Sequence, residues 1–169
     1  FDQPPDHPVV MVSWVDAVSF CKWLTARELA AGRLKKGEVY RLPTDLEWSQ
    51  AVGLPAEKGA TPEARDMGVK DHFPWGTQWP PPQGAGNYTG QESGVDKAIA
   101  GYNDGFRYTS PVEAFPANSK GLYDLGGNAW EWCSDTWNAK DRSRVLRGGS
   151  WYQGSMQLGL LSSCRIPAA

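Results

Sequence analysis

The sequence predicts a single loop-rich domain in which two helices and a few short strands are joined by long irregular segments. The chain has 169 residues, a usual size for one domain and long enough to bury about two-thirds of its unfolded surface. It contains 9 tryptophans, 19 glycines and 13 prolines. This composition is typical of irregular structure held together by aromatic packing rather than by long helices.

The first helix is predicted from Ser13 to about Ala31. Ser13 is a favoured N-cap residue, and the acidic Asp16 follows at the third helical position. Gly32 is expected to end the helix. A short apolar run at residues 9–12 precedes it and predicts a strand. Apolar residues at three- and four-residue spacing predict one buried face, formed by Trp14, Ala17, Val18, Cys21 and Leu24.

The second helix is predicted to begin after Thr44. Thr44 and Glu47 have the spacing of a capping box, in which the two residues cap each other's backbone N–H groups. Trp48 and Ala51 are expected to lie on the core side. Arg41 and Glu47 are interpreted as structural partners rather than as catalytic residues.

The later segments are mostly irregular. Residues 53–70 are rich in Pro, Ala, Glu and Gly and predict a surface loop with a short helix near residues 62–67. The Trp-Pro-Pro-Pro run at residues 79–82 excludes a helix or a central strand. Residues 145–150 predict a core strand that ends in a glycine pair.

The charge distribution excludes several classes of function. The net charge of −2 and the lack of a Lys/Arg cluster argue against a nucleic-acid surface. No apolar run approaches the length of a membrane span, and no signal-peptide pattern opens the chain. Residues 1–5 have the character of a linker or of mid-domain sequence, so they indicate no compartment.

The three cysteines, Cys21, Cys133 and Cys164, are too few and too scattered for a disulfide framework. One disulfide with one free thiol is one interpretation, and three reduced buried thiols is the favoured one. The chain has only 2 histidines and no Cys-x-x-Cys pair. A zinc site or a histidine-based iron site is therefore poorly supported.

Residues 121–132 bring acids, an amide, aromatic rings and glycines together in one short stretch. Asp124, Asn128 and Glu131 supply oxygens, and the glycine pair between them permits a tight turn. A carboxylate buried among aromatic rings without a partner is costly. Calcium, which accepts about 6–8 oxygens, is one solution. The other is a metal-free turn whose carboxylates accept backbone N–H groups, because the spacing is not that of an EF-hand.

The same stretch carries a family resemblance. Residues 121–132 and 144–151 resemble the formylglycine-generating enzyme (sulfatase-modifying factor) family, and residues 7–14, 41–48 and 73–76 agree. These segments occur in the family's order and span nearly the whole chain. The resemblance implies an α+β domain related to the C-type lectin fold, with a small, mostly antiparallel sheet and bound calcium.

The resemblance implies two structural calcium ions. The first would be held by Asn87, Tyr88, Asp104 and Phe106. The second would be held by Asp124, Gly127, Ala129 and Glu131. Taken alone, Asn87 and Asp104 are also ordinary turn formers. Calcium would tie together loops that lack hydrogen-bonded ladders, so its binding energy would contribute to folding.

The cysteines that the resemblance implies for the family's chemistry are not present at the matching positions of this sequence. Its members use two cysteines after the Gly-Gly-Ser-aromatic segment to oxidise a sulfatase cysteine with copper and oxygen, and here those positions are Gln153 and Leu158. Neither can bind copper(I) as a thiolate, so copper is not expected and oxidase activity is disfavoured. The alternative is a copper-dependent formylglycine-generating oxidase that uses Cys164 or Cys133 in an unfamiliar arrangement.

The resulting hypothesis is a non-catalytic, calcium-stabilised binding or interaction module. Related domains without the cysteines are accessory modules, some on bacterial protein kinases, or variable ligand-binding proteins. The ligand, a protein or a small molecule, is expected near the segment after Gly-Gly-Ser-Trp. The alternative is that these side chains only cover the core edge. The candidate ligand-binding residues are Trp130, Ser150, Trp151, Tyr152, Gln153 and Met156.

The resemblance also bears on the ends of the chain. The family normally closes with a Gly-Phe-Arg strand, often followed by a cysteine that pairs with the cysteine of the first helix, here Cys21. The chain ends at residues 164–169 without such a segment. We therefore expect residues 1–169 to form one domain that is incomplete at both ends, with Cys21 lacking its family partner, and that belongs to a larger multidomain protein.

Overall fold

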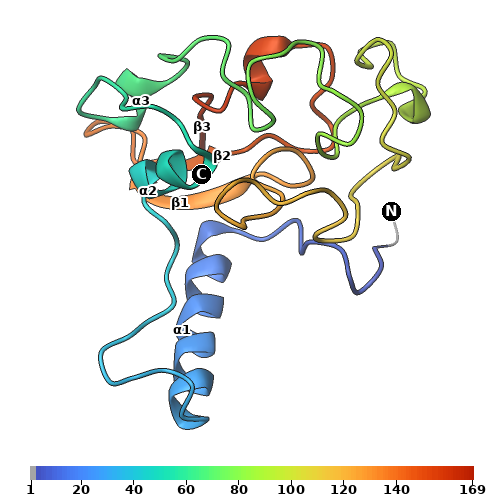
Figure 1. The fold of residues 1–169 in the computed structure, drawn as a ribbon. Coiled ribbons are helices and arrows are strands. Elements are labelled where there is room, and N and C mark those ends of the chain that lie inside the picture. Colours follow the sequence, from blue (N-terminus) through green and yellow to red (C-terminus); the bar gives the residue numbers. More distant parts are fainter. Residues whose placement is uncertain (1–2) are drawn as a thin grey trace.

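A computed structural model describes residues 3–169. Over this range the chain forms three α-helices, two short 3-10 helices and one antiparallel sheet of three strands, joined by long loops (Figure 1). The predicted α+β class and the loop-rich character are confirmed. The relation to the C-type lectin fold stays a prediction.

Helix α1 spans Trp14–Ala30 and begins with a full capping box. The Asp16 backbone N–H donates to the Ser13 hydroxyl at 3.2 Å, and the Ser13 N–H donates to the Asp16 carboxylate at 2.9 Å. Ala31 caps the other end, and Gly32 follows with a φ of 70°. The predicted start and end of this helix are therefore confirmed.

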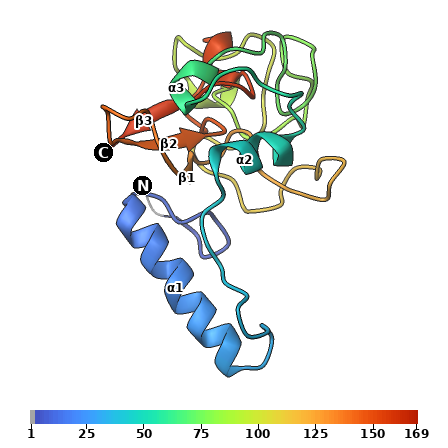
Figure 2. The ribbon, with the colours of Figure 1, turned by 90° about the vertical axis from the view of Figure 1, so that its left-hand side faces the viewer.

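The predicted buried face of α1 is only half-buried, which corrects the expectation. Figure 2 shows α1 extending away from the rest of the fold. Its amino end is attached to the sheet, because the Trp14 indole N–H donates to the Cys133 carbonyl at 3.0 Å and the Arg144 guanidinium lies 3.8 Å from the Trp14 ring centroid. Further along, the helix has little to pack against, so Cys21 is half-buried. Glu28 is the residue of α1 that is buried.

The strand predicted at residues 9–12 is absent from the described structure. Met11 has a φ of 60°, which is outside the extended region of the backbone. Val9 and Met11 are exposed. The prediction was wrong because an apolar run becomes a strand only where another strand pairs with it, and none of the described strands does so.

Helix α2 spans Asp45–Val52 and confirms the second prediction. Thr44 and Glu47 form the capping box, with N–H···O distances of 2.7 and 3.2 Å. Trp48 is fully buried, and α2 packs against the sheet. The Arg41 guanidinium lies 2.7 Å from the Glu47 carboxylate, so their predicted pairing is also confirmed.

The segment at residues 53–70 is more than the predicted surface loop. It contains the short helix α3, Pro62–Arg65, near the expected place. However, Glu57 and Arg65 direct buried side chains into the interior, where they join an ion cluster. This burial could not be predicted from the sequence pattern, because the ion-pair partners of both residues lie outside this segment.

Strands β1 (Glu131–Thr136), β2 (Arg144–Arg147) and β3 (Ile166–Ala168) form the sheet in the order β1-β2-β3. Both pairings are antiparallel, as predicted. The predicted strand at residues 145–150 corresponds to β2 but ends earlier, because Gly148 and Gly149 have φ values of 93° and 79°.

Aromatic packing supports the loops, as the composition predicted. The Phe73 and Trp75 rings stack with centroids 4.9 Å apart, and the Tyr88 ring meets Trp75 edge-on at 5.1 Å. This group belongs to a core cluster that includes Leu160 of the 3-10 helix Gln157–Leu160. A second, smaller cluster joins α2 to the sheet through Trp48, Cys133 and Val145.

A buried ion cluster connects α2, residues 53–70 and the sheet. It consists of the side chains of Asp45, Glu57, Arg65, Arg147 and Arg165. Asp45 accepts from all three arginines, and Glu57 accepts from Arg165 at 2.7 Å. Although burial alone raises the pKa of Asp45, the charges of Arg147 and Arg165 outweigh it and lower that pKa.

Within residues 3–169, none of the helices has both the length and the apolar character that crossing a membrane requires.

Candidate functional site

The structure brings together the residues of the first predicted calcium site, which we call the first oxygen site: Asn87, Tyr88, Asp104 and Phe106. The backbone N–H groups of Tyr88 and Phe106 donate to the two carboxylate oxygens of Asp104 at 2.7 and 2.8 Å. The Asn87 side-chain nitrogen donates to the Tyr108 carbonyl at 2.8 Å. Its Oδ1 is buried and has no hydrogen-bond donor in the described part of the chain. The set offers hard oxygen ligands of the kind that calcium prefers.

The Asp104 carboxyl is electrostatically unfavourable as it stands. Burial raises the pKa of Asp104 to about 6, the N–H groups of Phe106 and Tyr88 oppose this rise, and the charge of Glu92 adds to it. No lysine or arginine of residues 3–169 forms an ion pair with Asp104. A bound cation would supply the missing positive charge.

The second oxygen site comprises Asp124, Gly127, Ala129 and Glu131, on the turn that leads into β1. Asp124 and Gly127 have φ values of 54° and 76°. A Cβ on Gly127 would overlap the Asn87 carbonyl oxygen, so only glycine allows the two segments to approach this closely. The Asn128 N–H then donates to the Asn87 carbonyl at 2.9 Å. The two oxygen sites are therefore joined through the backbone.

Glu131 is the most buried acid of the second oxygen site. Its carboxylate accepts from the Trp48 indole N–H at 2.5 Å. Burial raises the pKa of Glu131 to about 7, the Trp48 bond opposes this rise, and the charge of Asp124 adds to it. Asp124 itself accepts from the Glu113 N–H at 2.9 Å. Asp124 thus accepts a backbone N–H, as the metal-free alternative requires, whereas the donor to Glu131 is a side-chain indole. Each carboxylate keeps further lone pairs that could bind a cation.

Two details of this stretch differ from the expectation. Asn128 does not offer its side-chain oxygen to a cation, because Oδ1 accepts from the Ser110 N–H at 3.1 Å. Tyr123 is exposed rather than buried around the acids. Among residues 3–169, no three His, Cys, Asp or Glu side chains gather closely enough to hold a metal by themselves. Each oxygen site therefore depends on carbonyl and amide oxygens.

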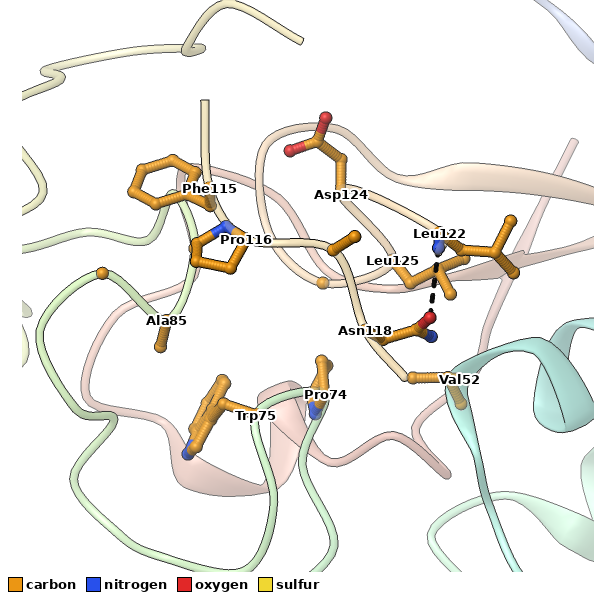
Figure 3. A pocket seen from close by; sticks show the side chains of 14 residues that line it. Val52, Pro74, Trp75, Ala85, Phe115, Pro116, Asn118, Leu122, Asp124 and Leu125 are labelled. Carbon is orange, nitrogen blue, oxygen red and sulfur yellow. Dashed lines mark hydrogen bonds between the residues drawn. The ribbon is translucent and has the colours of Figure 1, made fainter. Parts of the chain in front are cut away.

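A cavity of about 280 Å³ lies beside the second oxygen site (Figure 3). Trp75, Phe115 and two prolines line it, and Asp124 is its one charged lining residue in the described chain. Figure 3 shows the Asp124 carboxylate directed away from Trp75. The sequence did not predict this cavity, because its walls come from segments far apart in the chain.

The six predicted ligand-binding residues divide between two other cavities. Tyr152, Gln153 and Met156 line a cavity of about 370 Å³, here named the Gln153 cavity, whose opposite wall is residues 95–97. Trp130, Ser150 and Trp151 line a separate cavity of about 360 Å³ together with residues 9–12. The prediction placed these six residues on one surface. It did not include residues 95–97 or residues 9–12, which form the opposite walls.

The family cysteine positions have other roles here. The backbone N–H and the hydroxyl of Ser150 donate to Gln153 Oε1 at 3.1 and 2.6 Å. Leu158 is exposed on the 3-10 helix Gln157–Leu160. A carboxamide and an aliphatic side chain thus stand at the two positions.

All three cysteines are free. Cys133 and Cys164 are buried, and this burial raises the pKa of Cys133 to about 12 and that of Cys164 to about 11. Cys21 lies on the half-exposed helix α1 and is not buried as predicted. The favoured prediction of three reduced thiols holds, with this one correction.

Comparison with known proteins identifies the family. Residues 1–167 match the family described as sulfatase-modifying factor enzyme 1-like domain. The chain belongs to this family. The predicted resemblance is therefore confirmed.

Curated relatives include both enzymes and an inactive form. The chain is 36% identical over 162 residues to the formylglycine-generating enzyme of Bos taurus. The aligned region covers 87% of this chain and 36% of that protein. It is 39% identical over 150 residues to inactive C-alpha-formylglycine-generating enzyme 2 of Bos taurus, covering 86% of this chain and 39% of that protein. The chain thus spans well under half the length of these relatives.

Other relatives place the domain in different proteins. Serine/threonine-protein kinase pkn1 of Chlamydia caviae is 28% identical over 162 residues, which are 86% of this chain and 19% of the kinase. Among solved structures, PvdO from Pseudomonas aeruginosa superposes with a TM-score of 0.62 at 24% identity, covering 100% of this chain and 59% of PvdO. Treponema denticola variable protein 1 has a TM-score of 0.52 at 23% identity, covering 97% and 66%. These two structures support the fold.

Proposed function

We propose that the chain is a non-catalytic, calcium-stabilised binding module that recognises its ligand beside the segment after Gly-Gly-Ser-Trp. The observation that carries this proposal is the occupancy of the two family cysteine positions by Gln153 and Leu158. Copper(I) requires soft thiolate ligands. A carboxamide and an aliphatic side chain cannot provide them.

The remaining cysteines offer no substitute pair. Cys133 and Cys164 are buried, and their raised pKa values keep the thiols protonated at neutral pH. Cys21 lies on α1, away from the segment that follows β2. The similarity to an inactive member of the family supports the same interpretation.

The two oxygen sites would hold calcium and thereby position the binding segment. In the second site, the turn that carries Gly127 and Ala129 also holds the start of this segment, because the Asn128 carbonyl accepts from the Trp151 N–H at 3.0 Å. In the first site, Thr89 follows Tyr88 and donates its N–H to the Gln153 carbonyl at 3.0 Å. Calcium at both sites would therefore fix the loops that support the recognition surface.

The module would work as part of a larger protein. The chain corresponds to a minority of the length of its curated relatives, and one of these is a kinase. We propose that catalytic activity, where the whole protein has one, resides outside residues 1–169.

Copper(I) titration against a chromophoric chelator tests the absence of oxidase chemistry. We expect no tight, thiol-dependent copper binding and no turnover of a cysteine peptide. The double variant Gln153→Cys, Leu158→Cys is the positive control, and we expect it to gain thiol-dependent copper binding. Tight dithiolate binding by the unmodified chain would support the alternative, a copper-dependent oxidase, and would contradict the proposal.

A further inference from the structure

We propose that the Gln153 cavity recognises a peptide segment that carries an acidic side chain next to an apolar one, with Gln153 as a specificity-determining residue. This inference rests on the proposed binding function and assigns a ligand class to part of its surface. It depends on the residues that build the cavity, on the fixed orientation of Gln153, and on the groups that line the rim.

The walls of the cavity are held together by backbone hydrogen bonds. The Ser155 N–H donates to the Lys97 carbonyl at 2.7 Å and connects the two walls directly. Behind them, the Thr89 N–H donates to the Gln153 carbonyl at 3.0 Å, and the Ile99 N–H donates to the Thr89 carbonyl at 2.8 Å. These bonds fix the width of the cavity independently of any side-chain conformation.

Gly154 is required for this arrangement. An ideal Cβ built on Gly154 would overlap the Lys97 carbonyl oxygen and would lie 3.0 Å from the Lys97 carbonyl carbon. Because these are backbone atoms, the walls would have to separate to accept any side chain. A glycine at this position is what permits the close approach.

The orientation of the Gln153 carboxamide follows from its partner. The Ser150 backbone N–H can only donate, so the group that it meets at 3.1 Å must be the oxygen Oε1. The nitrogen Nε2 is then directed elsewhere, and no acceptor for it is found among the described residues. Since Gln153 lines the cavity, it contributes a free hydrogen-bond donor, which selects a ligand group that accepts.

The charged residues of the opposite wall favour an acid. The Lys97 ammonium forms no ion pair or hydrogen bond within residues 3–169, and it shares the cavity with Gln153. Asp96 is the one acid that lines the cavity in the described chain, and it limits the preference for a negative ligand. The donors of Gln153 and Lys97 outnumber this acceptor, so a carboxylate is the complementary group.

The rim also carries three exposed side chains with large apolar surfaces. Tyr152 and Met156 are 68% and 72% exposed, and Val95 is 45% exposed. Tyrosine supplies rigid contact area at low entropic cost, and methionine adapts to different apolar shapes. A peptide presents an acidic and an apolar side chain on neighbouring residues, which matches the donors and the apolar rim together.

The test begins with an array of cysteine-free hexapeptides of randomised composition, probed with the whole 169-residue chain. We expect enrichment of Asp or Glu beside Leu, Met, Phe or Ile. The best peptide is then titrated into the 15N-labelled protein, where we expect the side-chain NH2 signals of Gln153 to shift. Exclusion of cysteine separates this binding from the family's enzymatic chemistry.

Three variants test how the side chains of the cavity affect the affinity for the acidic peptide. Gln153→Glu keeps the oxygen that Ser150 needs but replaces the free donor by an acceptor, and we expect at least tenfold weaker binding of the acidic peptide. Asp96→Asn removes the opposing charge and should tighten binding severalfold. Lys70→Gln changes an exposed lysine outside the cavity and should leave affinity unchanged.

Two outcomes would overturn the inference. Peptides that bind without shifting Gln153, or that bind equally well to Gln153→Glu, would place recognition elsewhere while leaving the proposed binding function intact. An array without acidic-apolar enrichment would exclude the assigned ligand class. The copper titration tests the proposed function separately, so the two failures are distinguishable.

Discussion

The buried ion cluster and the two oxygen sites solve the same problem in opposite ways. Asp45, in the cluster, is fully buried and contacts three arginines, and its pKa is lowered. Asp104 and Glu131, in the oxygen sites, have raised pKa values of about 6 and about 7 and no ion pair with a described lysine or arginine. Burial raises the pKa in all three cases, and only Asp45 has internal cations that reverse the effect.

The difference shows which buried carboxylates lack a compensating internal cation in the described part of the chain. Removing one partner from a compensated buried pair leaves a charge without a counter-ion, which costs more than the pair contributes. An uncompensated acid can instead be protonated or can bind a metal ion. The oxygen sites also contain amide and carbonyl oxygens, and we propose that they bind calcium, which accepts such ligands.

Asp45→Asn should have the largest effect. It removes the charge that compensates Arg147 and Arg165, whose side chains are fully buried. We expect a loss of about 3–5 kcal/mol in the free energy of unfolding, measured by urea denaturation followed by tryptophan fluorescence. Asp96→Asn, the same change at an exposed position, should have little effect. A loss for Asp45→Asn no larger than for this control would mean that the ion cluster does not stabilise the connection between α2, residues 53–70 and the sheet.

Calcium should stabilise the protein strongly. At 100 times its dissociation constant, a ligand that binds only the folded state adds about 2.7 kcal/mol per site. For a chain of this length that corresponds to a rise of roughly 5–10 °C per site in the midpoint of thermal unfolding.

Variants at the two oxygen sites assign this shift. Asp104→Asn and Glu131→Gln should each remove about half of the calcium-dependent shift in melting temperature. Asp6→Asn, at an exposed acid outside both sites, should keep the whole shift. Equal melting temperatures with calcium and with a chelator would contradict the calcium assignment.

The pH dependence should differ between the metal-free and the calcium-bound protein. The ordinary pKa of Glu131 is 4.5 and its folded pKa is about 7, while for Asp104 the values are 3.8 and about 6. Between each pair of values the folded state binds more protons than the unfolded state, so stability falls as pH rises. In chelator, the melting temperature should therefore fall between about pH 5 and pH 7, over the upper part of these windows.

Calcium should abolish this fall in stability, because it keeps both carboxylates deprotonated in the folded state and the unfolded state also binds few protons above pH 5. At the acid end the sign is opposite for Asp45, whose folded pKa is lowered. Its contribution to stability should be lost as pH falls below the ordinary aspartate range. A melting temperature in chelator that rises steadily from pH 5 to pH 7 would show that Asp104 and Glu131 are not the uncompensated acids that we describe.

The smallest effect concerns backbone packing rather than charge. Gly154→Ala should force the walls of the Gln153 cavity apart and should cost about 1–3 kcal/mol, as overpacking typically does. Gly159→Ala is the control. Gly159 lines the same cavity, but a Cβ at this position would lie at an ordinary 3.9 Å from the Gln153 side chain. The control should be nearly neutral in urea denaturation. Equal losses in the free energy of unfolding for the two substitutions would contradict the proposal that Gly154 is required for the close approach of the cavity walls.

Local features of the fold could be predicted from the sequence, because they depend on residues a few positions apart. The capping boxes at Ser13 and Thr44 and the helix end before Gly32 are of this kind. The burial of α1 could not be predicted, since periodicity shows which face is apolar but not whether anything covers it. The run at residues 9–12 failed for the same reason.

The family resemblance grouped residues that the structure brings close together at the first oxygen site, but the geometry of the cavities could not be predicted. The family motifs placed Asn87 near Asp104, and the structure brings them together. Periodicity and composition could not show that Gln153 would bond Ser150, that residues 95–97 would face it, or that Arg65 would enter the core. These contacts depend on how distant loops pack, and sequence patterns carry little information about such packing.

Isothermal titration of calcium into chelator-treated protein tests whether the two oxygen sites bind calcium. We expect saturable binding of about two ions per chain, with one ion lost in Asp104→Asn and the other lost in Glu131→Gln. Binding of no calcium by the folded, metal-free protein would contradict it. The raised pKa values of Asp104 and Glu131 would then mark carboxyl groups that remain protonated rather than ligands that hold a cation.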